Sequence, residues 1–142
     1  MALSEITLID FPKILDPRGN LSFIQNYDQI PFEVKRVYWI YDVPGGEQRG
    51  GHAYRSLQEV IIALSGSFDV VLYDGQHERR IPMNRSYYGL YVPNMYWRHL
   101  ENFSTNALAF IVADQPYDES DYIRDIQEFK QLKLGNKSIY RI

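Results

Sequence analysis

Short apolar runs recur through the middle of the chain, and each ends at residues that favour turns. The runs are RVYWIYDV (36–43), QEVIIAL (58–64), FDVVLY (68–73), YYGLYV (87–92) and ALAFIVA (107–113). FDVVLY ends at Asp74 and Gly75, a dipeptide typical of two-residue hairpin turns. Strands at this spacing, with no helical pattern between them, predict an all-β fold, an antiparallel sandwich or barrel.

Only the C-terminal part has the pattern of a helix. In DESDYIRDIQEFKQL (118–132), Tyr122, Ile126 and Phe129 fall on roughly one face at the helical period. Asp118 is the candidate N-cap, with acidic residues in the first turn as the helix dipole prefers. No internal repeat, linker or low-complexity segment interrupts the chain, so residues 1–142 are expected to form one domain.

Composition narrows the function classes. The chain has 142 residues and a net charge of −3, so no overall basic field attracts nucleic acid or an anionic membrane. It contains no cysteine, which excludes disulfides, thiolate metal sites and thiol nucleophiles. The N-terminus lacks a basic segment followed by a long apolar one, and no run is long enough to span a membrane. We therefore expect a cytoplasmic protein.

The stretch GEQRGGHAYRSLQEVIIALSG (46–66) has the spacing of a metal site with one ligand missing. Gly46, His52, Glu59 and Gly66 fall where the first cupin motif has them, and this spacing resembles that motif. The position of its second His is occupied by Tyr54. The second cupin motif is matched loosely by GLYVPNMYWRHLEN (89–102).

The second motif argues against a metal. Its ligand position is Arg98, and a guanidinium has no acceptor lone pair with which to coordinate a cation. His99 lies one place later, and adjacent strand residues face opposite ways. His52 and Glu59 alone are too few for a typical transition-metal site. We expect no metal, and a cavity that holds an anionic or hydroxyl-rich ligand.

Five segments in order carry a resemblance to one group of enzymes. They are DPRGNLSFI, IPFEVKRVYWIYD, RGGHAYRSLQEVIIALSGS, LYVPNMYWRHLENFS and PYDESDYIRDIQEF. From about residue 6 to residue 132 the chain resembles the cupin-fold sugar-nucleotide 3,4-ketoisomerases, which act on dTDP-4-keto-6-deoxyglucose. The resemblance implies a single jelly-roll barrel that needs no metal or other cofactor. It also implies a homodimer with exchanged N-terminal strands, working in the biosynthesis of a 3-amino-3,6-dideoxy sugar.

The resemblance further implies that His52 is the main acid/base group and that Tyr38 assists it. The reaction moves a carbonyl from C4 to C3 of the hexose through an enediolate. An imidazole suits it, because an unperturbed pKa of about 6.5 allows a proton to be taken and given at neutral pH. Family members commonly read HAH where this chain reads HAY, so Tyr54 replaces a cavity histidine.

Strand alternation places the neighbouring side chains. Arg36 and Tyr38 share one face of their strand, and Tyr54 shares the face of His52. The phenol of Tyr54 is a much weaker base than imidazole, so we assign Tyr54 to binding or orienting the sugar. Glu59 either holds the imidazole of His52 in one tautomer or pairs with Arg98.

The diphosphate of a sugar nucleotide needs fixed cations, because the sequence has no glycine-rich phosphate loop leading into a helix. Five arginines are candidates for binding it: Arg18, Arg36, Arg49, Arg55 and Arg98. Arg18 lies in the turn segment DPRGN, Arg36 shares the face of Tyr38, and Arg98 is in the cavity by its motif position. Arg49 and Arg55 have weaker support.

Three other functions stay open. A sugar-nucleotide epimerase of related jelly-roll fold would invert a centre beside the ketone without moving the carbonyl. A sugar-binding cupin that has lost catalysis is consistent with the missing histidine, although His52 together with Tyr38 favours activity. A metal-dependent cupin comes last because of Arg98. The product is open to either the gluco or the galacto configuration at C4.

Overall fold

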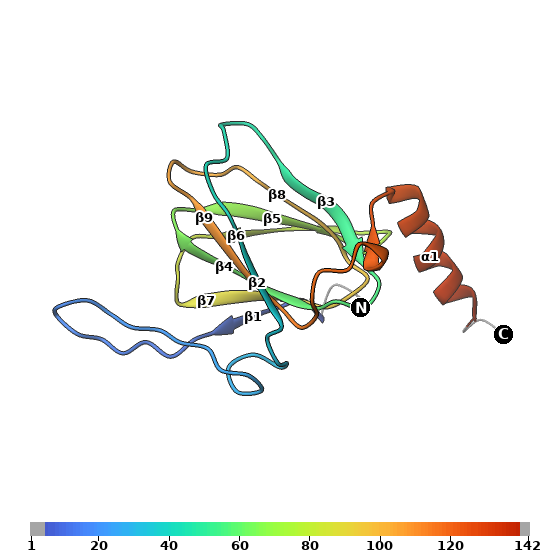
Figure 1. The fold of residues 1–142 in the computed structure, drawn as a ribbon. Coiled ribbons are helices and arrows are strands. Elements are labelled where there is room, and N and C mark those ends of the chain that lie inside the picture. The colour runs from blue at the N-terminus through green and yellow to red at the C-terminus, as the bar shows by residue number, and fades with distance from the viewer. Residues whose placement is uncertain (1–4, 140–142) are drawn as a thin grey trace.

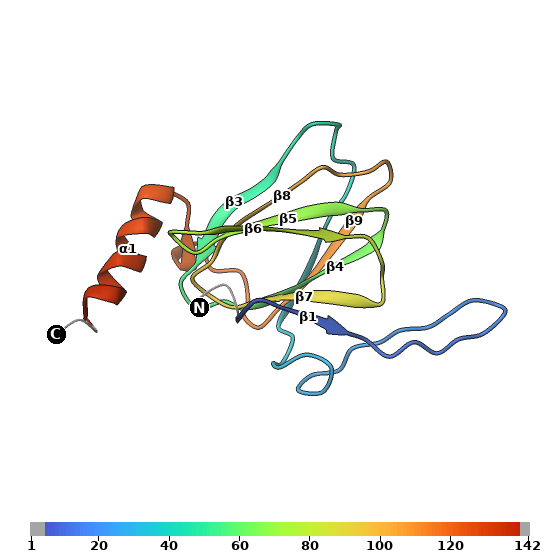
Figure 2. The same cartoon turned by 180° about the vertical axis from the view of Figure 1, so that it is seen from behind.

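The chain folds into two five-stranded antiparallel sheets that face each other, with a helix at one end (Figures 1 and 2). The computed structural model describes residues 5–139, and side chains as far as residue 135. The first sheet has the strand order β1 (Thr7–Asp10), β7 (Tyr88–Val92), β4 (Glu59–Ser65), β9 (Leu108–Ala113) and β2 (Arg36–Ile40). The second has the order β10 (Tyr122–Ile123), β3 (Arg49–Tyr54), β8 (Trp97–Glu101), β5 (Phe68–Tyr73) and β6 (Glu78–Met83). The all-β jelly-roll prediction is confirmed.

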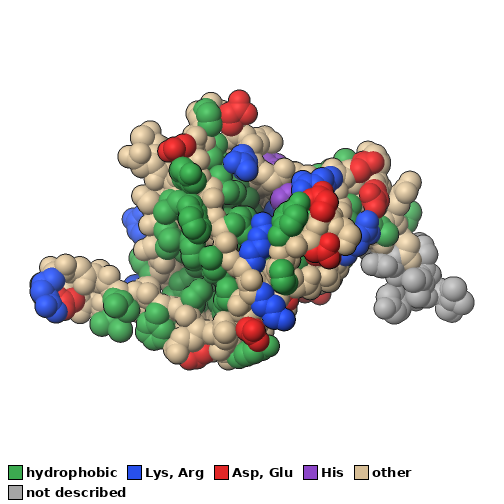
Figure 3. Space-filling view, viewed as in Figure 1, with side chains coloured by type: hydrophobic (Ala, Val, Ile, Leu, Met, Phe, Trp, Pro, Cys, Tyr) green, Lys and Arg blue, Asp and Glu red, His purple; other side chains and the backbone are tan. Residues whose placement is uncertain are grey.

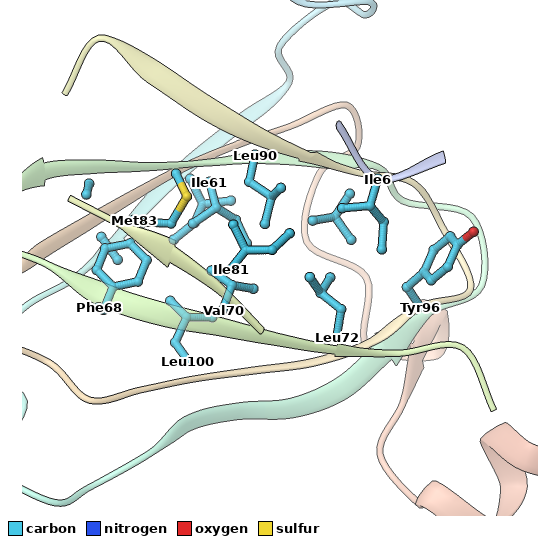
Figure 4. Close-up of a cluster of buried hydrophobic side chains, with 14 residues drawn as sticks. Ile6, Ile61, Phe68, Val70, Leu72, Ile81, Met83, Leu90, Tyr96 and Leu100 are labelled. Carbon is cyan, nitrogen blue, oxygen red and sulfur yellow. The ribbon is translucent and has the colours of Figure 1, made fainter. Parts of the chain in front are cut away.

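The main core lies between the sheets (Figure 4). Alternate residues of the strands point into it, as the period of two requires. Ile61 and Leu90 enter from the first sheet, and Val70 and Leu72 enter from the second. The outer face of β4 is also buried, because Ile30 and other apolar residues of the β1–β2 connection cover it. This double burial explains why 58–64 is an apolar run rather than an alternating one.

The β5–β6 turn differs from the sequence prediction. Tyr73 pairs with Glu78, so residues 74–77 connect the strands. The Asp74 carboxylate accepts hydrogen bonds from the backbone N–H groups of Gln76 and His77, at 2.8 and 2.7 Å. An aspartate that caps its own turn in this way stabilises it. The Asp74 N–H also donates to the His77 carbonyl oxygen at 3.2 Å, so the tight turn is centred on Gly75 and Gln76, one residue later than the sequence predicts.

The C-terminal helix begins later than the sequence predicts. Helix α1 spans Ile126–Ile139, and Asp118 instead caps a 3₁₀ helix, η2 (Glu119–Asp121). Between them, Tyr122 and Ile123 form β10 and pair with Tyr54 and Ala53. The side chain of Asp125 accepts from the N–H of Gln127, and this provides the cap for α1.

One buried carboxylate holds the C-terminal segment against β3. Asp121 is 9% exposed and accepts three hydrogen bonds from the β3–β4 connection. The donors are the N–H of Ser56 at 2.9 Å, its hydroxyl at 2.7 Å and the N–H of Leu57 at 3.1 Å. These bonds hold the next residue, Tyr122, against Tyr54 at the C-terminal end of β3.

The β1–β2 connection begins with a hairpin that projects from the barrel (Figure 1). Ile14 and Leu21 form a bridge, and the turn between them contains Arg18. Three apolar side chains of this hairpin are exposed: Ile14, Leu15 and Leu21. Within residues 5–139, no helix has the length and apolar character needed to cross a membrane.

Candidate active site

A cavity of about 330 Å³ opens between the two sheets, on the side bounded by β2, β3 and β10. Its apolar floor includes Ile61, Leu100 and Ile111. The polar lining consists of Arg36, Arg49, Arg98, Arg124, His52, Tyr38, Tyr54, Tyr122 and Glu59. Figure 3 shows histidine and basic side chains next to each other on this side of the molecule. Four arginines and one glutamate give the lining a positive balance, which suits an anionic ligand.

A β-bulge in β3 places His52 in the cavity. Gly50 pairs with His99 and His52 pairs with Arg98, so Gly51 is an extra residue on this strand. Gly50 and Gly51 have φ angles of 99° and 84°, which glycine adopts without strain. A Cβ at Gly50 would lie 3.1 Å from the carbonyl oxygen of Arg98. The bulge thus requires glycines, and it sets His52 and Arg98 opposite each other on the inner face.

The imidazole of His52 is enclosed by aromatic rings. The ring centroids of Tyr54 and Tyr122 lie 4.9 and 5.1 Å from that of His52. Its Nε2 atom is buried and has no hydrogen-bond partner among residues 5–139. Burial, followed by the charges of Arg98, Arg124 and Arg36, lowers the pKa of His52 to about 3. At physiological pH the ring is therefore neutral and able to accept a proton through Nε2.

This low pKa predicts the pH dependence of the reaction. We expect kcat/KM to stay level as the pH falls from about 8 to about 5, because the free enzyme keeps His52 neutral throughout that range. The measurement is kcat/KM across this range in buffers of constant ionic strength. An acid limb centred near 6.5, the ordinary imidazole value, would contradict the buried environment described for His52.

Tyr38, Glu59 and Arg98 form a hydrogen-bonded network along one wall. Tyr38 donates its phenol proton to Oε2 of Glu59 at 2.7 Å, and Nη1 of Arg98 donates to Oε1 at 2.6 Å. Glu59 and Arg98 are each 1% exposed. Burial and the Glu59 carboxylate raise the pKa of Tyr38 well above its usual value, so the phenol stays protonated. Two roles were predicted for Glu59, orienting the imidazole of His52 and pairing with Arg98. In the structure Glu59 pairs with Arg98.

The hydroxyl of Tyr54 lies beside that of a second tyrosine. It is 3.4 Å from the hydroxyl of Tyr122, which also lies 3.5 Å from Nη1 of Arg36. Burial and the charge of Glu59 raise the pKa of Tyr54. A phenol with this environment is a hydrogen-bond donor at neutral pH, so the residue that replaces the usual histidine lacks that histidine's basicity.

The predicted arginines divide into two groups. Arg36, Arg49 and Arg98 line the cavity, whereas Arg18 and Arg55 do not. Arg18 pairs with Asp16 in the projecting hairpin, and its side chain is 90% exposed. Arg55 pairs with Glu128 of α1 at 2.7 Å and is not part of the cavity lining.

Two cavity residues, Tyr122 and Arg124, were missed by the sequence analysis. Arg124 lies over the Tyr122 ring, 4.2 Å from its centroid, and pairs with Glu119 at 2.6 Å. The segment YIRD held the signal: residues two apart share a face of a strand, and Tyr122 and Arg124 are two apart. Assigning the segment to a helix concealed this.

The positions of metal ligands in a cupin hold other groups. Tyr54 occupies one of them, and Arg98 occupies another with its guanidinium bound to Glu59. Within residues 5–139, no three His, Asp or Glu side chains converge as they would around a metal ion. The donors present, imidazole, phenol and guanidinium, are suited to proton transfer and anion binding.

Known proteins share this sequence pattern and fold. The family model "FdtA: WxcM-like, C-terminal" matches residues 4–134. A TDP-4-oxo-6-deoxy-alpha-D-glucose-3,4-oxoisomerase from Aneurinibacillus thermoaerophilus is 41% identical over 127 residues, covering 89% of this chain and 91% of that protein.

Two crystal structures show the same architecture. A sugar 3,4-ketoisomerase from Thermoanaerobacterium thermosaccharolyticum, in complex with TDP, superposes with a TM-score of 0.92 at 34% identity, covering 94% of this chain and 98% of the other. A TDP-quinovose 3,4-ketoisomerase from Campylobacter jejuni gives 0.85 at 39% identity, with coverage of 89% and 97%. With a family model matched over nearly its whole length and a relative at 41% identity, the chain belongs to the WxcM-like, C-terminal family.

Proposed function

We propose that the chain is a metal-independent 3,4-ketoisomerase that converts dTDP-4-keto-6-deoxyglucose into a dTDP-3-keto-6-deoxyhexose. The observation that carries the proposal is a neutral, buried His52 whose Nε2 is unpaired within the described chain, in a cavity bordered by arginines. The relative at 41% identity is named for this reaction.

The chemistry follows from the positions of these groups. His52 removes the hydrogen on C3, which the neighbouring ketone acidifies, and the resulting enediolate is stabilised by nearby positive charge. His52 then returns the hydrogen to C4. Arg36, Arg49 and Arg124 are the cavity cations with which we expect the diphosphate and the enediolate to interact. The 3-keto product is a substrate for an aminotransferase, which would make a 3-amino sugar.

One incubation tests the proposal. The protein is mixed with dTDP-4-keto-6-deoxyglucose in deuterium oxide, and the sugar is followed by NMR. We expect the ketone to appear at C3, with deuterium at C4 of the product and at C3 of the recovered substrate. Inversion of a centre with the ketone still at C4 would favour the epimerase, and binding without exchange would favour an inactive sugar-binding protein.

Metal independence is a separate prediction. The ligand positions held by Tyr54 and Arg98 cannot coordinate a transition metal in the cupin manner. We expect dialysis against a chelator to leave the rate of isomerisation unchanged, and elemental analysis to find no stoichiometric metal. Loss of activity that returns on adding one divalent metal would overturn this prediction.

A homodimer is part of the proposal, and the exposed apolar surface supports it. Val37, Trp39 and Leu64, on the outer face of the first sheet, are 45%, 55% and 43% exposed, and a continuous apolar area is visible there (Figure 3). Leu15 of the projecting hairpin is 73% exposed. Apolar areas of this kind mark interaction sites. Exchange of N-terminal strands would also carry Arg18, which lies outside its own cavity, towards that of a partner.

The dimer is tested by sedimentation. We expect about twice the chain mass of 16.7 kDa at micromolar concentration. Leu15→Glu should shift the protein towards the monomer, because it places a charge in the proposed interface. Leu134→Glu, at an exposed position on α1 (60%), is the matched control and should leave the mass unchanged. A monomeric wild-type protein would refute the dimer.

A further inference from the structure

Glu59 takes no part in the carbon steps assigned to His52. This carboxylate is one of the most buried charged groups among the described residues, and it lies at the start of β4, between β7 and β9. Its backbone is therefore held on both sides. Its two oxygens serve different partners, Oε1 for Arg98 and Oε2 for Tyr38.

This arrangement determines what Tyr38 offers the cavity. A phenol has one hydroxyl proton, and Tyr38 uses it to donate a hydrogen bond to Oε2 of Glu59 at 2.7 Å. Besides a hydrogen bond with the Tyr54 hydroxyl, what the Tyr38 oxygen offers a ligand in the cavity is a lone pair. In the resting site, Tyr38 is therefore an acceptor for a sugar hydroxyl instead of a donor to a sugar carbonyl.

We propose that Glu59 is a positioning residue that acts through Tyr38 and briefly stores the hydroxyl proton of the sugar during isomerisation. The proposal rests on the ketoisomerase function proposed above. Moving a ketone from C4 to C3 transfers one hydrogen between carbons and one proton between oxygens, and His52 accounts only for the first.

His52 takes the hydrogen from C3, and the electron pair of that C–H bond forms a C3–C4 double bond with the negative charge on O4. As His52 returns the hydrogen to C4, O3 becomes a carbonyl and loses its proton to the Tyr38 oxygen. The original phenol proton passes to Oε2 of Glu59 in the same event. Glu59 then returns a proton through Tyr38 to O4, which restores both residues.

Arg98 holds the Glu59 carboxylate in one orientation, with Oε2 towards Tyr38. Its Nε and Nη2 donate to the carbonyl oxygen of Tyr96 at 3.1 and 2.8 Å, while Nη1 holds Oε1 of Glu59. The guanidinium stays protonated under all ordinary conditions, so it fixes the carboxylate without competing for the proton. Only Oε2 is left to exchange a proton, and it faces Tyr38.

The first experiment separates the two transfers. In deuterium oxide, exchange at C3 reports enediolate formation by His52, and appearance of the 3-ketone reports the complete reaction. We expect Glu59→Gln to lower ketone migration about 10²-fold, in the range for loss of a proton-transfer group. Exchange at C3 should stay within a few-fold of wild type. An equal fall in both rates would overturn the proposal, because a merely structural role affects both.

The second experiment asks whether Glu59 acts through Tyr38. Tyr38→Phe should produce the same partition between exchange and migration. Adding Glu59→Gln to Tyr38→Phe should not lower the rate of ketone migration further, because Tyr38→Phe already removes the proton path to Glu59. A further loss as large as that of Glu59→Gln alone would show an independent role and overturn the proposal.

Two controls keep the outcomes distinct. Glu59→Gln leaves Arg98 without its counter-charge and could be unstable for that reason. The double variant Glu59→Gln with Arg98→Gln removes both charges. It should show the same slow ketone migration with near wild-type exchange at C3. Its urea denaturation midpoint confirms that it is folded. A wild-type protein that shows neither exchange nor migration would refute the proposed function itself, whereas exchange without dependence on Glu59 would refute only the inference.

Discussion

Replacing His52 with asparagine is expected to lower the rate of ketone migration by about 10²–10⁴-fold, with the upper end favoured. In the proposed mechanism His52 is the base for both carbon steps, and no other histidine is placed to substitute for it. His77 lies in the β5–β6 turn, and His99 faces the outer side of its strand, where Nε2 contacts Glu101. Asparagine keeps a similar size and polarity, so the fold and nucleotide binding should persist.

The measurement is a time course of the 3-ketone by NMR, with TDP affinity determined in parallel. His99→Asn is the matched control, since it makes the same exchange outside the cavity, and it should leave the rate near wild type. If His52→Asn isomerises the keto sugar at the wild-type rate, the mechanism is wrong and Tyr38 becomes the first candidate for the base.

Replacing Arg98 with methionine is expected to destabilise the protein by about 3–5 kcal/mol. The change leaves the Glu59 carboxylate buried without its counter-charge, and an isolated buried charge is costly. It also removes the donors to the Tyr96 carbonyl. Methionine has a comparable length and no polar group, so the effect reports the lost charge more than a lost volume.

Urea denaturation followed by fluorescence gives the free energy of unfolding. Arg80→Met is the control: Arg80 also pairs with two carboxylates, those of Asp69 and Glu101, but its side chain is 49% exposed. Exposed pairs contribute about 0–1 kcal/mol. A loss for Arg98→Met no larger than that of Arg80→Met would contradict the buried network.

The strands were predictable because each is specified locally. The run at 60–63 is apolar on both faces since both are buried there. The alternation at 36–40 places Tyr38 inward and Trp39 outward. The helix start was not predictable from its pattern. Asp118 and Asp125 are both good caps, and pairing of the residues between them with β3 decides which one begins α1.

The candidate site divides in the same way. Motif spacing led to His52, Glu59 and Arg98, which all line the cavity. His52 and Arg98 are partners on the paired strands β3 and β8, whereas Glu59 reaches Arg98 from β4 of the opposite sheet. The pKa of His52 follows instead from burial and from arginines on three other strands or segments, which no local pattern contains. Tyr122 and Arg124 reach the cavity only through a pairing between residues far apart in the chain, so they escaped the sequence analysis.

The attachment of β10 to β3 has a consequence for the order of folding. The strands of both sheets other than β10 are complete by Ala113, but Tyr122 meets Tyr54 across a sequence separation of 68 residues. During synthesis the barrel strands therefore leave the ribosome before the cavity wall does. Contacts of such long range form late, because loop closure must precede them. The cavity therefore gains the wall formed by Tyr122 and Arg124 later than the rest of its lining.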